Sequence, residues 1–396
     1  MGGTGVEGGA ASAAGPLQGV KVVELAGIGP GPFAGMMLAD MGAEVLRVDR
    51  LSGSRGGSTA GHTDILGRGR RSVAVDLKHE AGREVILRLA TGADALIEGF
   101  RPGVTERLGI GPEDCRARNP RLVYGRMTGW GQEGPYATMA GHDINYVALS
   151  GTLSLIGRVG TPPVPPINLV GDFGGGGMVL AFGVVCALYE ASRSGQGQVI
   201  DAAMVDGSAL LAAFVWGLHH DGAWGERGTN LLDTGAWYYE VFETADGGYI
   251  SLGSLEPQFF AEMVRITGLA DDVDGRGPVA DQGDRAAWPE AKERLAAMIR
   301  TKTRDEWCRL LEGTDACFAP VLGIGEVPSH PHHAARGTFV EVGGVVQPGP
   351  APRFSRTPGA AGGPCPAPGQ HTDQALADWG FSPEEIAELR SVRAVG

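Results

Sequence analysis

Apolar runs and helical patterns alternate through the first third of the chain, and this alternation restricts the fold more than any other feature. Residues 20–27 (VKVVELAG) form a continuous apolar run typical of a buried strand, and the chain-breaking sequence IGPGP follows it. A helical pattern covers residues 33–42, and residues 43–50 predict a second strand. Such a β-α-β unit indicates a parallel sheet, because parallel strands are joined by a crossover rather than by a tight turn.

The same alternation continues beyond this unit. A helix is predicted at residues 80–92, and strands are predicted at residues 72–78, 93–100 and 121–131. The first half of the chain is therefore predicted to be an α/β, Rossmann-like domain with an open parallel sheet. Ligands of such sheets bind at the carboxyl ends of the strands.

Near residue 225 the pattern changes to that of a smaller α+β domain. Aromatic and β-branched residues alternate around the turn ADGG within residues 237–254, which indicates a hairpin, and helical segments follow. Ser382 and Glu385 form a capping-box pattern that predicts a short C-terminal helix. The predicted organisation is a flexible tail at 1–15, the first part of the large domain at 16–220, a linker at 221–230, the small domain at 231–325, and a strap and helix at 326–396 that return to the large domain.

Composition excludes several classes of protein. The net charge of −13 argues against a nucleic-acid or anionic-membrane surface, since those partners require a basic face. The five cysteines are odd in number and form no C-x-x-C pair, so we expect reduced thiols and a cytoplasmic location. The N-terminal residues lack the pattern of a signal peptide. The longest apolar stretch, residues 178–189, is too short to span a bilayer and predicts a buried helix.

Asp172 stands in front of a run of glycines in the segment NLVGDFGGGGMVLAF, residues 168–182. A helix N-cap would explain the aspartate. It would not explain four glycines, each of which costs about 1 kcal/mol relative to alanine inside a helix. The glycines therefore predict a floor on which a ligand approaches the backbone closely, with the carboxylate at its edge.

His142 begins a helical pattern in the segment MAGHDINYVALSG, residues 139–151. A helix N-terminus favours the neutral form of histidine, which then serves as a base near neutral pH. A simple capping role is an equally good explanation. The histidine-rich residues 329–333 (SHPHH) lack carboxylates and predict a surface loop, so no metal site is expected.

A set of motifs runs in one order along nearly the whole chain: VVELAGIGPGP, RPGVTERLGIGPEDC, RMTGWGQEGP, GHDINYVALSG, VGDFGGGG, GQGQVIDAAMVDG, RGTNLLDTGAWYY, SLEPQFF, GTDACFAPVL and PRFSRTPG. Together they resemble the α-methylacyl-CoA racemases of the family III CoA-transferase superfamily. A set of this length is far more specific than any single motif.

The resemblance implies a two-base enzyme. His142 and Asp172 match the catalytic histidine and aspartate, Glu256 matches the glutamate that pairs with the histidine, and Asp143 matches a residue that contacts the thioester beside Asp172. Chemistry agrees, because inverting a carbon next to a thioester requires proton removal on one face and proton delivery on the other. Backbone N–H groups at the start of the helix, those of His142 and Asp143, are the expected donors to the enolate oxygen. No metal, flavin or pyridoxal cofactor is expected, and coenzyme A is part of the substrate.

Basic residues follow the predicted strands and provide local charge for polyanionic coenzyme A: Arg50, Lys78, Arg101 and Arg107. Each one alone is better explained as a solvated surface side chain, but four of them at strand ends indicate a binding role. The resemblance adds further positions, with Ile28, Val75 and Leu77 beside the adenine and pantetheine and Tyr239 beside the acyl group. Two departures bear on substrate range: Trp237 stands where relatives usually carry proline, and residues 53–62 are longer than in close relatives.

Alternative functions remain open at this point. A CoA transferase of the same superfamily would use Asp172 as a nucleophile, which forms a mixed anhydride. A non-catalytic acyl-CoA-binding module would use neither His142 nor Asp172. A nicotinamide dehydrogenase is disfavoured because the usual glycine fingerprint is absent. The resemblance also implies a homodimer with the active site at the subunit and domain interface, and Glu256 lies in a different predicted domain from the other two residues.

Overall fold

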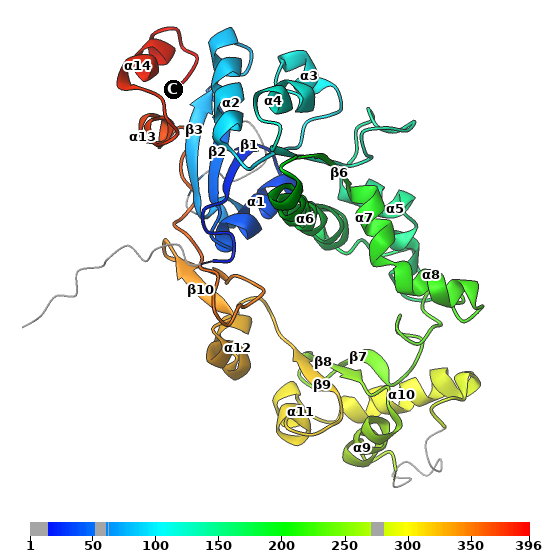
Figure 1. The fold of residues 1–396 in the computed structure, drawn as a ribbon. Helices are drawn as coiled ribbons and strands as arrows, with labels where there is room; N and C mark the ends of the chain where they lie inside the picture. Colours follow the sequence, from blue (N-terminus) through cyan, green and yellow to red (C-terminus); the bar gives the residue numbers. More distant parts are fainter. Residues whose placement is uncertain (1–14, 52–60, 62, 271–280) are drawn as a thin grey trace, which may run out of the picture. The chain divides into compact units, whose positions relative to one another are not determined.

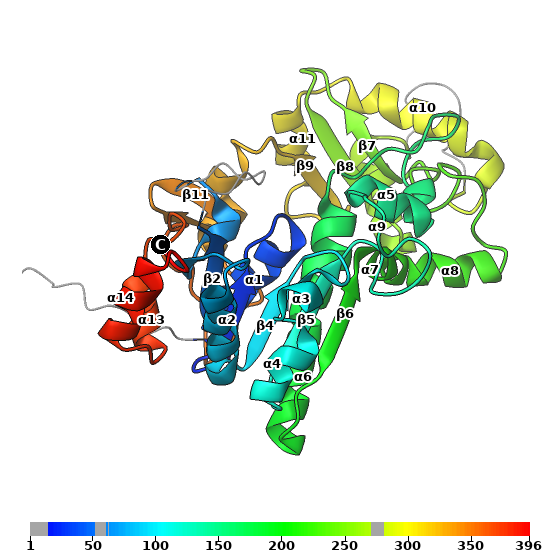
Figure 2. The same cartoon turned by 90° about the horizontal axis from the view of Figure 1, so that it is seen from above.

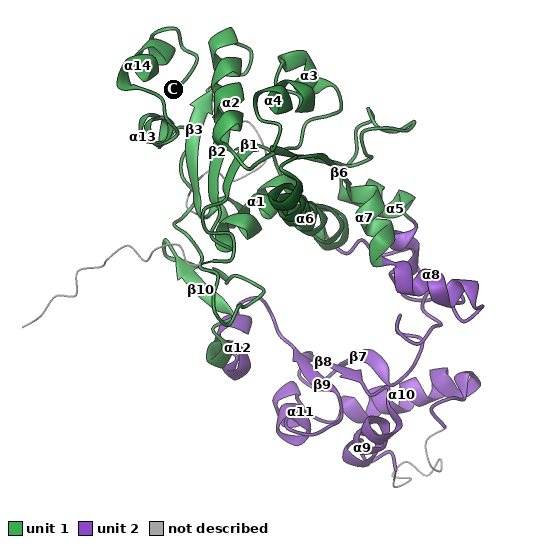
Figure 3. Cartoon of the chain, viewed as in Figure 1, with its two compact units in different colours: residues 1–150, 167–211, 334–396 green, residues 151–166, 212–333 purple. Residues whose placement is uncertain are grey.

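The structure is a computed structural model that describes residues 15–51, 61, 63–270 and 281–396. The chain divides into two compact units (Figure 3): unit 1 consists of residues 1–150, 167–211 and 334–396, and unit 2 of residues 151–166 and 212–333. The chain therefore enters unit 2 earlier than the predicted linker, returns to unit 1 later than predicted, and contributes a further segment, 151–166, that composition did not reveal. Most of the predicted tail and of residues 53–62 lies outside the described residues.

A six-stranded parallel sheet forms the centre of unit 1, as the alternating pattern predicted (Figures 1 and 2). Its strand order is β3-β2-β1-β4-β5-β6, with neighbouring strands parallel throughout. The strands are β1 (Lys21–Leu25), β2 (Glu44–Arg50), β3 (Arg70–Val75), β4 (Ala95–Glu98), β5 (Val123–Thr128) and β6 (Val199–Ala203). The order reverses between β1 and β4, which is the place where ligands of doubly wound sheets bind.

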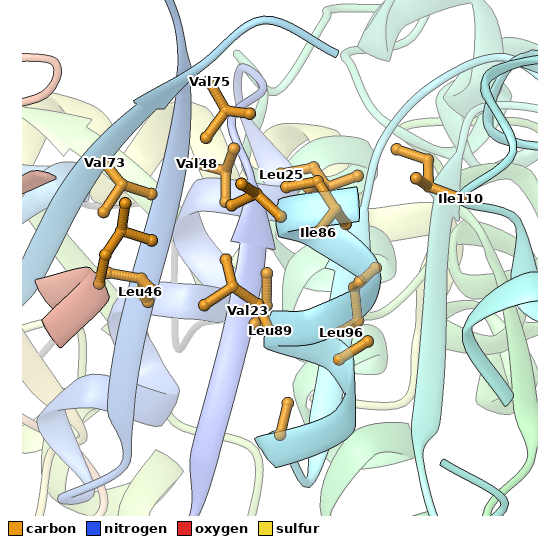
Figure 4. Packing of buried hydrophobic residues seen from close by; sticks show 14 of the residues in the cluster. Val23, Leu25, Leu46, Val48, Val73, Val75, Ile86, Leu89, Leu96 and Ile110 are labelled. Atoms are coloured by element: carbon orange, nitrogen blue, oxygen red, sulfur yellow. The ribbon is translucent and has the colours of Figure 1, made fainter. Parts of the chain in front are cut away.

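Helices cover both faces of this sheet, so its strands are apolar without interruption. On one face, Val23 and Leu46 pack with Ile86 and Leu89 of α2 (Figure 4). On the other face, Val22 packs with residues of α1 and α6. The helices of unit 1 are α1 (Pro30–Asp40), α2 (Glu80–Gly92), α3 (Val104–Leu108), α4 (Pro112–Arg118), α5 (Asp143–Leu149), α6 (Val179–Ser194), α7 (Met204–Leu211), α13 (Thr372–Asp378) and α14 (Pro383–Ser391).

The C-terminal part of the chain is attached to the β3 edge of unit 1. Its final residues form an antiparallel bridge between Val395 and Val75. The predicted capping box is confirmed, because Ser382 Oγ accepts from the N–H of Glu385 and the Glu385 carboxylate accepts from the N–H of Ser382. The predicted extended strap is only partly extended, because it also contains helix α13 and the hairpin of β10 (Phe339–Val342) and β11 (Val345–Pro348).

Unit 2 contains the predicted hairpin and a third strand that the sequence did not reveal. Strands β7 (Tyr239–Glu243), β8 (Tyr249–Gly253) and β9 (Phe318–Val321) form an antiparallel sheet. Its helices are α8 (Ala213–His220), α9 (Pro257–Thr267), α10 (Trp288–Ile299), α11 (Arg304–Leu311) and α12 (Pro331–Arg336), the last of which is shared with unit 1. Helix α12 occupies much of the histidine-rich segment that was predicted to be a loop.

Trp237 belongs to the core of unit 2. Its side chain is fully buried and contacts Tyr238 and Phe260 edge to face. Packing within unit 2 therefore covers the indole, and its effect on substrate range stays a prediction.

The glycine run has a structural purpose that differs from the predicted ligand floor. The residues Leu169–Met178 form a π-helix that continues into α6. A Cβ atom on Gly175 would lie 2.6 Å from the Ser208 nitrogen of α7, and one on Gly177 would lie 2.8 Å from the Pro30 oxygen of α1. The glycines therefore let α1 and α7 approach the backbone of the π-helix, and three of the four are buried by this packing.

Helix α6 is not buried all round, in contrast to the prediction. Met178, Phe182, Val185 and Tyr189 lie along one stripe and are exposed, with Phe182 71% and Tyr189 66% accessible. The continuous helical segment Leu169–Ser194 is 26 residues long and is long and apolar enough to cross a membrane by length and composition alone. That segment also contains Asp172 and the glycines that pack against α1 and α7.

Substitution of Gly207 tests the close approach of α7 to the π-helix. A Cβ atom at this position would lie 1.8 Å from the Gly175 oxygen, and backbone must move to make room. We expect Gly207→Ala to lower the free energy of unfolding by about 1–3 kcal/mol, the usual range for overpacking. Gly92→Ala is the control, because no atom lies within 4 Å of a Cβ there. Equal stability of both variants in urea unfolding would contradict this account.

Candidate active site

Asp172 lies in the first turn of the π-helix, beside the N-terminus of α1. A Cβ atom on Gly29, the residue before α1, would lie 3.1 Å from Asp172 Oδ2, so glycine is needed for this approach. Gly29 also has a φ of 68°, which glycine adopts without strain. The rings of Phe33 and Phe173, 4.8 Å apart, hold the two helices together next to the carboxylate. The carboxylate thus occupies the helix N-terminus where many related folds bind an external anion.

The environment of Asp172 raises its pKa above the ordinary value. Burial is the main cause, and the negative charge of Asp143 acts in the same direction. A hydrogen bond of 3.2 Å from Asn168 Nδ2 to Asp172 Oδ2 and the positive form of His142 lower the pKa and limit the rise. A carboxyl group with a raised pKa is suited to both accepting and delivering a proton near neutral pH.

His142 and Asp172 are brought close together although thirty residues separate them in the chain. Asp143, the residue after His142, accepts from the backbone N–H of Asp172 at 2.7 Å, so His142 and Asp172 lie in one region of unit 1. His142 is the N-cap of α5, and its side chain is exposed. Its own N–H donates to Asn145 Oδ1 at 3.0 Å. The N–H of Asp143, the first residue of α5, has no acceptor within the helix.

Asp143 connects the two elements that carry the acid–base pair. Its Oδ1 accepts from the backbone N–H of Asp172 at 2.7 Å, and its side chain is buried. A Cβ atom on Gly171 would lie 2.4 Å from this oxygen, so residue 171 must be glycine. The predicted proximity of Asp143 and Asp172 is therefore present, and the contact runs from carboxylate to backbone.

Tyr146 is a residue of this region that the sequence analysis missed. Its hydroxyl donates to the Gly141 carbonyl, immediately before His142, and its ring packs edge to face on Trp130 at 4.7 Å. Burial raises the pKa of Tyr146, and the charge of Asp172 raises it further, while Arg101 opposes the rise. The position of Tyr146, one helical turn after His142, was a signal that the sequence contained. Asn168 is related to Asp172 by the same spacing of four.

The residues predicted to bind coenzyme A lie at the carboxyl edge of the sheet. Ile28 follows β1, Arg50 ends β2, and Arg101 and Arg107 follow β4. These four are exposed, and Arg101 lies near enough to Tyr146 to influence its pKa.

The positions after β3 differ in accessibility. Lys78 is exposed, and Leu77 is partly buried against the core. Val75 is only 1% exposed and packs within the core, so its side chain is not available to a ligand.

Glu256 and Tyr239 belong to unit 2 and lie near the same edge of its sheet. Glu256 is the exposed N-cap of α9, and its charge raises the pKa of Cys317 in addition to the larger effect of burial. Cys317 accepts from the Gly253 N–H through its carbonyl, and the ring of Tyr239 lies 3.6 Å from a Cβ placed on Gly253. The two predicted residues therefore share one neighbourhood within unit 2.

The structure also bears on cysteine and metal chemistry. All five cysteines lie among the described residues, and none forms a disulfide, as predicted. Within the described ranges, no group of three His, Cys, Asp or Glu side chains is arranged to hold a metal ion.

The fold defines the class: an α/β protein of the doubly wound type, in which His142 and Asp172 lie in one region of unit 1. The model of CoA-transferase family III matches residues 17–372, and the chain belongs to this family.

Curated relatives and a solved structure agree with this assignment. The chain is 48% identical to the α-methylacyl-CoA racemase of Mus musculus and 45% identical to that of Homo sapiens, in each case over 96% of this chain and 97% of the relative. The structure of a CaiB/BaiF family protein from Brucella suis superposes with a TM-score of 0.77 at 28% identity, covering 92% of this chain and 100% of that one.

Substitution of Asn168 tests the electrostatic balance at Asp172. Asn168→Ala removes a hydrogen bond that stabilises the carboxylate, so the pKa of Asp172 is expected to rise further above its ordinary value. The protonated form then persists to higher pH. Carboxyl ¹³C NMR titration of aspartate-labelled protein measures the shift, and Asp172→Asn assigns the resonance by deleting it. An unchanged or lowered pKa would show that the hydrogen bond does not control this carboxyl group.

Proposed function

We propose that the chain is a racemase that interconverts (2R)- and (2S)-2-methylacyl-CoA thioesters. The observation that carries this proposal is the hydrogen bond of 2.7 Å from the backbone N–H of Asp172 to Asp143 Oδ1, which brings Asp172 and the neighbouring His142 into one region of unit 1. Burial also raises the pKa of Asp172. The names of the mouse and human relatives support it, since both are α-methylacyl-CoA racemases.

In the proposed reaction, one of the two groups removes the α-proton from one face of the carbon. The electron pair of the C–H bond moves into an enolate, and the other group delivers a proton to the opposite face. His142 and Asp172 exchange the roles of acid and base when the opposite enantiomer is the substrate. The N–H of Asp143 is the proposed donor to the enolate oxygen. These side chains supply all of the acid–base chemistry, so we propose no metal, flavin or pyridoxal cofactor.

The coenzyme A portion is proposed to lie along the carboxyl edge of the sheet. Arg50, Lys78, Arg101 and Arg107 provide positive charge there, and exposed Ile28 provides an apolar surface at the end of β1. Arg101 lies between the proposed coenzyme A site and the region of His142, because its charge opposes the rise in the pKa of Tyr146 that burial causes.

A CoA transferase is the second candidate and shares Asp172. In that reaction the carboxylate attacks the thioester carbonyl, and the thiolate of coenzyme A leaves to give a mixed anhydride. The adjoining His142 has a role in proton transfer and none in the anhydride mechanism.

Deuterium exchange distinguishes these functions. Wild-type protein incubated with a 2-methylacyl-CoA in D2O is expected to incorporate deuterium at the α-carbon with inversion. His142→Ala is expected to slow inversion by about 10²- to 10⁴-fold, the usual contribution of a general acid–base group. His220→Ala is the matched control, because His220 is exposed at the end of α8. A transferase would instead show no exchange with any 2-methylacyl-CoA. It would also form a hydroxamate at Asp172 when hydroxylamine attacks the mixed anhydride.

We also propose a homodimer, as the resemblance implies. The exposed stripe of Met178, Phe182, Val185 and Tyr189 on α6 supports it, because an apolar face of this kind is typical of a surface covered by another chain. In this proposal, Glu256 and Tyr239 of one subunit complete the site that contains His142 of the other.

Mixing two inactive variants tests this arrangement. If Glu256 acts on the partner's site, a mixed dimer of His142→Ala and Glu256→Gln chains contains one site with both defects and one intact site. Refolding the two together is therefore expected to restore about half of the wild-type activity of the mixed dimers. A lack of restoration, or a monomer in light scattering, would contradict the shared site. Co-refolding His142→Ala with Asp172→Asn is the control, since no intact site can form in that arrangement.

A further inference from the structure

Glu98 is the last residue of strand β4, and its side chain is buried. The segment that follows, residues 99–107, is called the β4–α3 turn here and carries Arg101 and Arg107. Glu98 is only 2% exposed. Its two oxygens have separate partners: Oε2 accepts from the backbone N–H of Phe100 at 2.6 Å, and Oε1 accepts from Arg126 Nε at 3.1 Å. One side chain therefore fixes the first residues of the turn and also engages the neighbouring strand.

Arg126 extends this connection to the far end of the turn. It lies opposite Glu98 in the register of β4 and β5 and is 7% exposed. Its terminal nitrogens bind the carboxylate of Glu106 on α3, with an Nη1–Oε1 distance of 2.8 Å. Glu106 directly precedes Arg107 in the chain. The Glu98–Arg126–Glu106 chain of interactions therefore reaches both ends of the turn.

The turn itself is short and closely packed. Gly103, the N-cap of α3, has a φ of 78°, and a Cβ atom on it would lie 3.2 Å from Nη1 of Arg107. The N–H of Val104 donates to the carbonyl of Arg101. The backbone that carries Arg101 and Arg107 is therefore held at Phe100 by Glu98 and at Glu106 by Arg126.

We propose that Glu98 is a positioning residue for the coenzyme A end of the substrate, and that it acts by holding Arg101 and Arg107 in the geometry that meets the phosphates. This inference rests on the proposed function, because it takes those two arginines as the anion-binding groups. Glu98 is inaccessible, so it acts through the turn and contacts no substrate atom.

The charge state of Glu98 gives the inference a pH dependence. Burial raises the pKa of Glu98 to about 7, and the hydrogen bond from Phe100 and the charge of Arg126 limit the rise, while Glu106 adds to it. Tyr124, also buried, faces the same carboxylate, and the charge of Glu98 raises the pKa of its hydroxyl in addition to the larger effect of burial. As the pH falls through about 7, Glu98 becomes neutral and its attraction for Arg126 weakens. Affinity for coenzyme A is therefore expected to fall on the acidic side.

Glu98→Gln tests the inference because the amide keeps the shape of the side chain and removes its charge. At about pH 8, the KM for 2-methylacyl-CoA and the Kd for free coenzyme A are each expected to rise about 10-fold, with kcat changed less than about 2-fold. The difference between variant and wild type is expected to shrink as the pH falls to about 6, where wild-type Glu98 is also neutral. This comparison cancels the titration of the substrate phosphate, which is common to both proteins.

Two further variants accompany it. Glu106 is exposed and pairs with Arg126, so the Glu106→Gln variant is expected to fold normally. It is expected to raise the Kd for coenzyme A by about 3-fold, and this result is informative even if Glu98→Gln is unstable. Glu84→Gln is the matched control, because Glu84 pairs with Arg118 at an exposed site and is expected to leave the Kd unchanged.

The outcomes separate this inference from the proposed function. Coenzyme A binding that is unchanged in both Glu98→Gln and Glu106→Gln, or a loss in kcat with unchanged KM, overturns the positioning role and leaves the racemase proposal standing. Wild-type protein that binds no coenzyme A overturns both. Tight binding of coenzyme A without racemisation overturns the racemase proposal alone, and the Kd comparison then still decides the role of Glu98.

Discussion

The close contact of backbone with backbone at the glycine run is the constraint on which the site depends. Gly175 and Gly207 bring the π-helix and α7 together, and Gly177 lets α1 pack on the same segment. Any side chain at these positions would separate the helices. Their separation would carry Asp172 away from Gly29 and from the start of α1. The glycines act on chemistry indirectly, because they determine where a carboxylate can lie.

Charge at the site follows from this packing. Burial between helices raises the pKa of Asp172. The hydrogen bond from Asn168 and the positive charge of His142 lower the pKa and oppose this rise. Asp143 has two effects, since its hydrogen bond fixes the backbone of Asp172 and its negative charge raises the pKa of the carboxyl group. A group with so many opposed influences changes its protonation state with small movements of its neighbours. Proton transfer in both directions requires a group of this kind.

The sequence predicted the parallel sheet well because strands buried on both faces are recognisable as unbroken apolar runs. Helix α2 was predicted with its observed limits, and the capping box of Ser382 was predicted correctly. Strand β6 was missed because it lies at the sheet edge, where three of its five residues are not buried. Strand β9 was missed because its partner β8 lies far away in the chain.

Family motifs indicated candidate site residues, whereas contacts that depend on tertiary packing could not be predicted from the sequence. His142 and Asp172 were predicted from motifs and lie in one region of unit 1, and their roles stay predictions. The glycines were predicted to face a ligand, but they contact α1 and α7. The sequence pattern does not show that these two helices pack on the glycine run. Tyr146 was overlooked for a similar reason, since its importance depends on the position of Gly141 in space.

The interrupted course of unit 1 has a consequence for biogenesis. Its core includes Leu376, Ile386 and Val395, whereas unit 2 is complete at residue 333. During synthesis from the N-terminus, unit 2 therefore emerges from the ribosome in full while the β3 edge of the sheet still lacks its covering helices. Chaperones that recognise exposed apolar surface have their longest opportunity to act in that interval. The nascent chain becomes native in unit 1 only after translation has passed the residues that close this edge.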